Sequence, residues 1–144
     1  MAGSESGSGP AVISMAYPDN YDAPRDGVVM VRWPALTAGQ TIRLAQAGCT
    51  YAVSTTSLSF SSPGGSGMFD VLQQSIPTEC GGATEDRCVW TAQSTVPWIV
   101  ITSSIPRSGD NPVAFSVSAS GAAQPRSGQI LVRDRVVTIT PAAR

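Results

Sequence analysis

The sequence contains neither histidine nor lysine. Histidine is the commonest general base and zinc ligand, and lysine is required for Schiff-base and P-loop chemistry. The sequence also shows no pair of carboxylates and no activated nucleophile in a recognisable arrangement. We therefore predict that the protein is not an enzyme and that it has no metal site and no cofactor.

Charged residues are scarce as well, at 13% of the 144 residues. Nine basic against ten acidic residues give a net charge of -1 (9 − 10), which predicts no basic surface for nucleic acid. No apolar run approaches the roughly 18 residues of a membrane span. The N-terminus lacks the basic and apolar regions of a signal peptide, so we expect neither membrane insertion nor an export signal in this stretch.

Short apolar runs alternate with polar or small residues and are separated by turns rich in the 14 glycines and 11 prolines. Val113, Phe115 and Val117, for example, alternate with small residues, as a half-buried strand requires. No stretch has sustained helical periodicity. The pattern predicts an all-β fold, an Ig-like antiparallel β-sandwich of about seven strands.

One segment of the sequence recurs at an offset of 101 residues. Residues 24–32, Pro-Arg-Asp-Gly-Val-Val-Met-Val-Arg, resemble residues 125–133, and residues 42–47 match 137–142 if the loop Trp33 to Gly39 carries six extra residues. Two unrelated hairpins of similar composition are the alternative explanation. The repeat predicts a complete domain over 49–144, preceded over 1–48 by the C-terminal half of another, with residues 1–9 as a flexible linker.

The half repeat has too few strands to bury its own apolar side chains. Val28, Val29, Met30 and Val31 lie in one predicted strand, and Ile42 and Leu44 lie in the next. We therefore expect this half to contact a neighbouring Ig-like repeat or to cause self-association by strand pairing between copies.

Several motifs of the complete repeat resemble those of the BACON family of bacterial and phage Ig-like modules. They are Cys49-Thr50-Tyr51-Ala52-Val53-Ser54, the turn Gly64-Gly65-Ser66-Gly67, Cys88-Val89-Trp90, Pro97-Trp98-Ile99 and Arg126-Ser127-Gly128. Two features depart from the family: Pro141 replaces the common closing Gln, and residues 76–87 look like an insertion.

The resemblance implies a non-catalytic accessory module that is secreted or exposed on a cell or virion surface. Binding of carbohydrate or mucin, hence a glycan or glycoprotein partner, is the function proposed for the family. A structural or spacer module of a tandem array is the alternative. Fold analogy alone does not choose between the two.

Three cysteines, Cys49, Cys80 and Cys88, are too few for a structural zinc site and suggest one disulfide with one thiol left over. The resemblance favours a disulfide between Cys49 and Cys88, and a local Cys80–Cys88 bond stays open.

Aromatic side chains are the candidate ligand-binding residues, because a flat ring packs against the apolar face of a sugar. We expect Trp90 to lie in the core. The remaining candidates are Trp33, Tyr17, Tyr21 and Trp98, although core packing is the favoured interpretation for Trp98 as well. Arg25 and Arg126 hold equivalent turn positions, and we expect them to bind backbone carbonyls or Asp26. The acidic residues Asp19, Asp22, Glu79, Glu85 and Asp86 match no cation-binding loop and are expected to be solvated.

Overall fold

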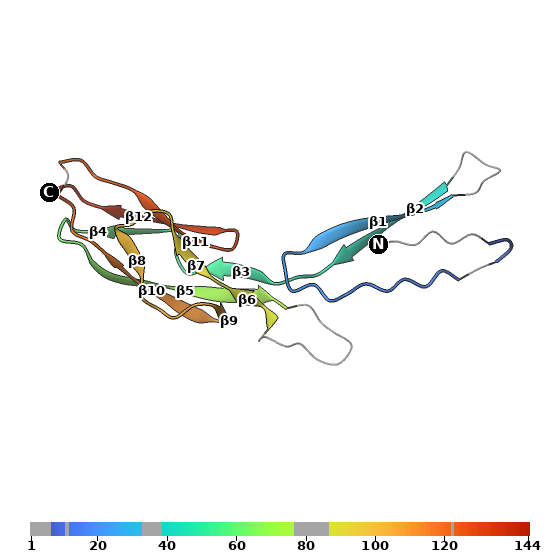
Figure 1. Ribbon diagram of the computed structural model, residues 1–144. Coiled ribbons are helices and arrows are strands. Elements are labelled where there is room, and N and C mark those ends of the chain that lie inside the picture. The colour runs from blue at the N-terminus through green and yellow to red at the C-terminus, as the bar shows by residue number, and fades with distance from the viewer. Residues whose placement is uncertain (1–6, 11, 33–38, 77–86, 122) are drawn as a thin grey trace.

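The computed structural model describes residues 7–10, 12–32, 39–76, 87–121 and 123–144. These residues form an elongated molecule, with a β-sandwich at one end and a two-stranded hairpin extending away from it (Figure 1). No described segment is a helix that could cross a membrane. The strands in chain order are β1 (Arg25–Arg32), β2 (Gly39–Gln46), β3 (Thr50–Val53), β4 (Ser57–Phe60), β5 (Gly65–Ser75), β6 (Val89–Trp90), β7 (Ala92–Ser94), β8 (Ile99–Ile101), β9 (Arg107–Ser108), β10 (Asn111–Val117), β11 (Gly128–Val132) and β12 (Arg135–Pro141).

The sandwich consists of two four-stranded sheets, with strand orders β3-β5-β10-β8 and β4-β12-β11-β7, and a short β6-β9 pair. Neighbouring strands are antiparallel except β4 and β12, which are parallel. This exception arises because only residues 54–56 separate β3 from β4, so the chain changes sheets without reversing direction. The prediction of an all-β, Ig-like sandwich is confirmed, with this one parallel pair.

The core lies between the two sheets and follows the alternation in the sequence. In β10, Val113, Phe115 and Val117 are buried, whereas the intervening residues are more exposed. Trp90 is 1% exposed and its Nε1 donates a hydrogen bond to the carbonyl oxygen of Gly109 at 3.0 Å. The expectation that Trp90 lies in the core is therefore confirmed.

A disulfide joins Cys49 to Cys88, as the family resemblance implied. Both cysteines are buried, and the bond connects the start of the sandwich to the strand that carries Trp90. Cys80 lies outside the described residues. Because Cys88 is bonded to Cys49, the alternative Cys80–Cys88 bond is not formed in this structure.

The hairpin pairs β1 with β2 along eight residues, from Arg25 opposite Gln46 to Arg32 opposite Gly39. Its register places Val29 opposite Ile42. In the sandwich, Ile130 lies opposite Val137 in the β11–β12 hairpin. The two hairpins thus pair in the same alignment that the sequence repeat uses, while the division into two repeats remains a prediction.

Candidate functional site

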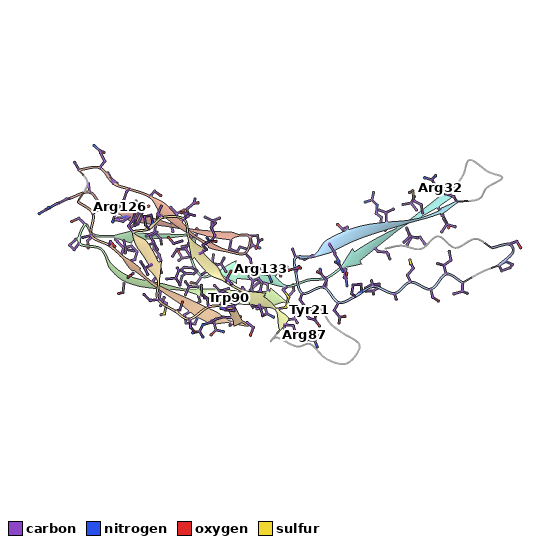
Figure 2. All side chains as sticks on the ribbon, in the orientation of Figure 1. Tyr21, Arg32, Arg87, Trp90, Arg126 and Arg133 are labelled. Atoms are coloured by element: carbon purple, nitrogen blue, oxygen red, sulfur yellow. A yellow bond between two sulfur atoms is a disulfide. The ribbon has the colours of Figure 1, made fainter. Side chains whose placement is uncertain are left out.

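The hairpin meets the sandwich in a joint formed by residues 20–24, 47–49, 87–89 and Arg133. Tyr21, Arg87 and Arg133 come together at the end of the sandwich that faces the hairpin (Figure 2). The joint is the region where side chains from the most distant parts of the chain converge, so it is the candidate functional site.

Asn20 links the two segments of the chain that enter and leave the hairpin. Its Nδ2 donates hydrogen bonds to the carbonyl oxygens of Ala23 at 2.7 Å and Ala47 at 3.2 Å. Its Oδ1 accepts a hydrogen bond from the backbone N–H of Asp22 at 3.3 Å. Asn20 is a buried polar residue, 4% exposed, and these bonds satisfy its amide.

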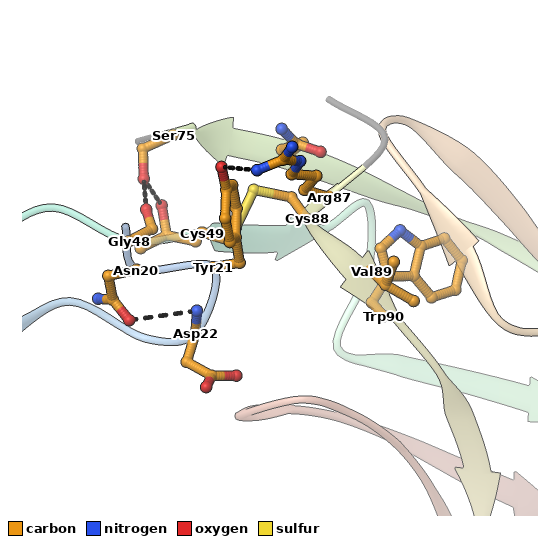
Figure 3. The surroundings of a disulfide bond; sticks show 12 residues. Asn20, Tyr21, Asp22, Gly48, Cys49, Ser75, Arg87, Cys88, Val89 and Trp90 are labelled. Carbon is orange, nitrogen blue, oxygen red and sulfur yellow. Dashed lines mark hydrogen bonds between the residues drawn. A yellow bond between two sulfur atoms is a disulfide. The ribbon is translucent and has the colours of Figure 1, made fainter. Parts of the chain in front are cut away.

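Gly48 allows the two segments to approach each other closely. A β-carbon at this position would collide with the carbonyl oxygen of Asp22 and with the backbone of the next two residues. The backbone N–H of Cys49 donates to the same Asp22 oxygen at 2.8 Å, and Ser75 Oγ donates to the Gly48 carbonyl at 2.8 Å (Figure 3). The joint is therefore fastened by backbone contacts that only glycine allows.

Arg133 connects the β11–β12 hairpin of the sandwich to the joint. It lies in the two-residue turn between β11 and β12 with a φ of 53°, a conformation that is unfavourable for residues with a β-carbon. Its Nη2 donates to the carbonyl oxygens of Val89 at 2.6 Å and Tyr21 at 3.3 Å, and its Nη1 lies 3.2 Å from Asp22 Oδ1. One guanidinium thus bonds to β6 and to the segment that enters the hairpin.

Tyr21 makes a second connection on the other side of the joint. Arg87 Nη1 donates a hydrogen bond to the Tyr21 hydroxyl at 2.8 Å, and the guanidinium carbon lies 5.3 Å from the centroid of the ring. The Tyr21 ring lies beside the Cys49–Cys88 disulfide in Figure 3. Cation–π contact and hydrogen bond together tie the segment before the hairpin to residue 87.

Tyr51 is a buried residue of the sandwich that contacts the joint. It is 1% exposed, and its hydroxyl donates to the carbonyl oxygen of Cys88 at 2.6 Å. Burial raises the pKa of the Tyr51 hydroxyl, and the positive charge of Arg133 offsets part of that rise. The Arg133 guanidinium lies 5.8 Å from the ring centroid.

The predicted ligand-binding aromatics do not come together. Tyr17 is 69% exposed in the segment before the hairpin, and Tyr21 belongs to the joint. Trp98 lies elsewhere, under the guanidinium of Arg126, whose central carbon is 4.2 Å from the ring centroid. Trp33 lies outside the described residues. The described candidates form no common aromatic shelf.

Trp98 is held by packing. A β-carbon at Gly128 would collide with its indole, so the ring fits closely over that glycine. The ring face that Arg126 covers is not available for a sugar to stack on. Trp98 therefore packs against the core, as the favoured interpretation expects, and a ligand-binding role for it stays a prediction.

Arg25 and Arg126 bind backbone carbonyls, as expected from their turn positions. Arg25 Nη2 donates to Pro18 O at 3.4 Å, and Arg126 Nη2 donates to Ala119 O at 3.1 Å. Arg25 also donates from Nε to Gln46 Oε1 at 2.8 Å, and it makes neither a hydrogen bond nor an ion pair with Asp26. Arg25 in β1 and Arg126 two residues before β11 each link their hairpin to the segment that precedes it.

The acidic residues form no cation site among the described residues. Asp22 pairs with Arg133, and Asp19 Oδ2 accepts a hydrogen bond from the Tyr21 hydroxyl at 3.5 Å. Glu79, Glu85 and Asp86 lie outside the described residues.

Beside the joint is a polar hollow of about 530 Å³. Gln73 and Asp110 are linked across it, because the backbone N–H of Gln73 donates to Asp110 Oδ1 at 2.7 Å. Gln73 Oε1 accepts from the backbone N–H of Gly109 at 3.0 Å, whereas its Nε2 has no hydrogen-bond partner among the described residues. The hollow is lined by Gln73, Gln74, Ser75, Ile76, Gly109 and Asp110.

Sequence reasoning missed four residues of the joint: Asn20, Gly48, Arg87 and Arg133. The repeat contained a signal for Arg133, because it aligns with Arg32 at the offset of 101 residues. Asn20 and Gly48 lie in polar connecting segments, where neither periodicity nor a motif distinguishes them from solvent-exposed turn residues.

No protein-family model matches the sequence, and no curated protein matches it. Among solved structures, the chain is similar to a Bacteroides ovatus GH5 xyloglucanase in complex with a XXXG heptasaccharide, with a TM-score of 0.50 and 12% identity; the match covers 67% of this chain and 19% of that one. The chain is also similar to domains 4 and 5 of the S-layer protein SbsC, with a TM-score of 0.41 and 16% identity, covering 83% of this chain and 57% of that one. These similarities concern the fold alone, and the chain spans about a fifth of the xyloglucanase.

Proposed function

We propose that the protein is a non-catalytic structural module of a tandem array of Ig-like repeats of the BACON type. The observation that carries this proposal is the joint, in which Arg133, Asn20 and Gly48 fix the direction in which the hairpin leaves the sandwich. Here a buried amide and an arginine with an unfavourable φ both serve to orient the hairpin on the sandwich. Such an arrangement is suited to hold successive repeats in line.

An exported location on a cell or virion surface, or in the medium, is part of the proposal. Its support is the buried Cys49–Cys88 disulfide at the joint, because disulfides persist mainly in oxidising compartments. Lack of histidine and lysine supports the non-catalytic role.

Small-angle X-ray scattering of the full chain tests the structural role. A fixed joint predicts that one elongated conformation fits the data. The variant Gly48→Ala should require an ensemble of hairpin directions, because its new methyl group displaces the backbone around Asp22. Gly121→Ala is the matched control, since a β-carbon there meets nothing within 4 Å. An ensemble already required for the unsubstituted chain would refute the structural role.

Adhesion to a glycan is a second candidate function, favoured by the polar hollow beside the joint. Amide, hydroxyl and carboxylate groups line it, and such groups bind sugar hydroxyls. One structural neighbour is a xyloglucanase bound to a heptasaccharide, which makes xyloglucan fragments a reasonable first probe.

Titration with the XXXG heptasaccharide, followed by amide chemical shifts, tests this candidate. Binding in the hollow predicts shifts at Gln73, Gln74 and Gly109 that disappear in Gln74→Ala. Gln93→Ala on the exposed face of β7 is the control and should leave the shifts unchanged. Shifts confined to other surfaces, or no shifts with this sugar and a wider glycan panel, would rule out glycan binding in the hollow and leave the structural role as the only candidate function.

A further inference from the structure

The β1–β2 hairpin has two unpaired edges, whereas its counterpart in the sandwich has none. In the sandwich, β11 pairs with β7 on one edge and β12 pairs with β4 on the other. Within the described residues, β1 and β2 pair only with each other. Such edges present a row of unpaired backbone N–H and C=O groups.

The counterpart hairpin identifies what fits each edge. Residues 130–132 of β11 pair antiparallel with residues 94–92 of β7, and residues 138–141 of β12 pair parallel with residues 57–60 of β4. With offsets of 101 and 95 residues, the equivalent edges are residues 29–31 of β1 and residues 43–46 of β2. The first edge therefore fits an antiparallel strand and the second a parallel one.

The inner face of the hairpin is also uncovered. In the counterpart hairpin, Ile130 and Val137 are fully buried, with 0% exposure. Their equivalents Val29 and Ile42 are half-buried and 43% exposed, respectively. On the same face, Val31 and Leu44 are half-buried, whereas their equivalents Val132 and Ile139 are fully buried, with 0% exposure. An apolar surface of this kind marks an interaction site.

Arg25 and Arg126 make one equivalent contact and differ in another. Both donate to equivalent carbonyl oxygens, those of Pro18 and Ala119, which are also 101 residues apart. Arg126 is covered by the ring of Trp98. Among the described residues no aromatic ring covers Arg25.

We propose that the hairpin is the docking site for the complementary strand half of a neighbouring Ig-like repeat, equivalent to residues 49–108 of this chain. Its β4-like strand adds to the edge of β2, its β7-like strand adds to the edge of β1, and its tryptophan covers Arg25. The inference rests on the proposed function, because it names the partner of the structural module. A second copy of the chain is a poor occupant, because its own β4 and β7 already pair with β12 and β11.

The test is a full chain extended at its N-terminus by a copy of its own residues 49–108, joined directly to Ser8. Ser8 is the equivalent of Gly109 at the offset of 101 residues. Amide hydrogen exchange in β1 and β2 is then measured residue by residue. Docking predicts exchange roughly 100-fold slower than in the unextended chain, as expected when an open hairpin becomes the centre of a sheet.

Three controls make the result decisive. An extension of the same composition in scrambled order should leave exchange unchanged. In the extended chain Val29→Asp should abolish the protection, because it places a charge on the covered face, whereas Val28→Asp on the opposite face should not. Concentration-dependent protection of the unextended chain would instead identify a second copy as the occupant and overturn the proposal.

Unchanged exchange in the extended chain would also overturn the proposal. That failure is distinguishable from failure of the proposed function. Scattering by the unextended chain reports on the joint, whatever the edges of the hairpin bind.

Discussion

The guanidinium of Arg133 lies 3.2 Å from the carboxylate of Asp22, although 111 residues separate them in the chain. The carboxylate is 88% exposed, so the ion pair itself contributes little to stability. The strength of the contact comes from the two backbone carbonyls that the same guanidinium binds, those of Val89 and Tyr21. Arg133 therefore determines orientation more than it determines the stability of the sandwich.

Replacement of Arg133 should separate these two effects. Arg133→Gly removes the side chain and also relieves the positive φ, so we expect the free energy of unfolding of the sandwich to change by less than about 1 kcal/mol. Arg133→Ala removes the same contacts but keeps the unfavourable φ, and it should be less stable than the glycine variant. Urea denaturation measures both; a glycine variant that is less stable than the alanine variant would contradict the role of strain.

Loss of the disulfide should destabilise the sandwich. The Cys49–Cys88 bond spans 39 residues, and the chain-entropy relation gives about 4 kcal/mol for a loop of that length. We expect the double variant Cys49→Ala/Cys88→Ala to unfold at correspondingly lower urea concentration. Cys80→Ser is the control and should unfold as the unsubstituted chain does; a double variant of equal stability would show that the bond contributes nothing.

Stability should fall at alkaline pH because of Tyr51. Burial raises the pKa of its hydroxyl in the folded chain above the ordinary value of 10.0, so the unfolded chain ionises first as the pH rises. The contribution of the protonated Tyr51 hydroxyl to the free energy of unfolding is fully present below pH 10. It is lost as the pH rises through the pKa of Tyr51 in the folded chain. Unfolding curves between pH 9 and 12, together with tyrosine absorbance, measure this loss.

Tyr51→Phe is the control for the pH effect. The loss of stability at alkaline pH should be smaller in this variant than in the unsubstituted chain. At neutral pH the free energy of unfolding should fall by about 1 to 3 kcal/mol, because the Cys88 carbonyl loses its hydrogen-bond donor. A phenylalanine variant with the same alkaline decline would assign the effect to other groups.

Trp98 should behave as a packing residue. Trp98→Ala removes the ring between Arg126 and Gly128, and we expect a loss of about 3 kcal/mol in the free energy of unfolding. Thermal unfolding followed by circular dichroism measures the loss. A variant that keeps its stability but loses binding on a glycan array would restore Trp98 as a ligand-binding residue.

The sandwich was predictable because several of its strands, β10 most clearly, alternate apolar residues with polar or small ones. The buried residues of β10 and Trp90 in β6 followed from spacing and from the cysteine two positions before Trp90. The parallel β4–β12 pair was not predictable, because it depends on a change of sheet over residues 54–56 that leaves no mark on the periodicity. The Cys49–Cys88 pairing came from the family resemblance, since three cysteines alone allow several pairings.

The joint was harder to predict than the fold. Its contacts combine backbone carbonyls with single side chains from distant segments, such as Asn20 with Ala47 and Arg133 with Val89. Hydrogen bonds to backbone carbonyls depend on tertiary position and carry no sequence pattern of their own. An aromatic residue is a ligand-binding candidate from its type alone, whereas the contact of Trp98 with Arg126 becomes visible only in the structure.

The most direct test of the central claim, that the joint fixes the hairpin on the sandwich, is a set of residual dipolar couplings from the full chain. A fixed joint predicts that couplings from β1 and β2 and those from β5, β10, β11 and β12 fit one alignment tensor, and that Gly48→Ala requires two. If the unsubstituted chain already requires two tensors of different magnitude, the hairpin moves independently and the account is contradicted.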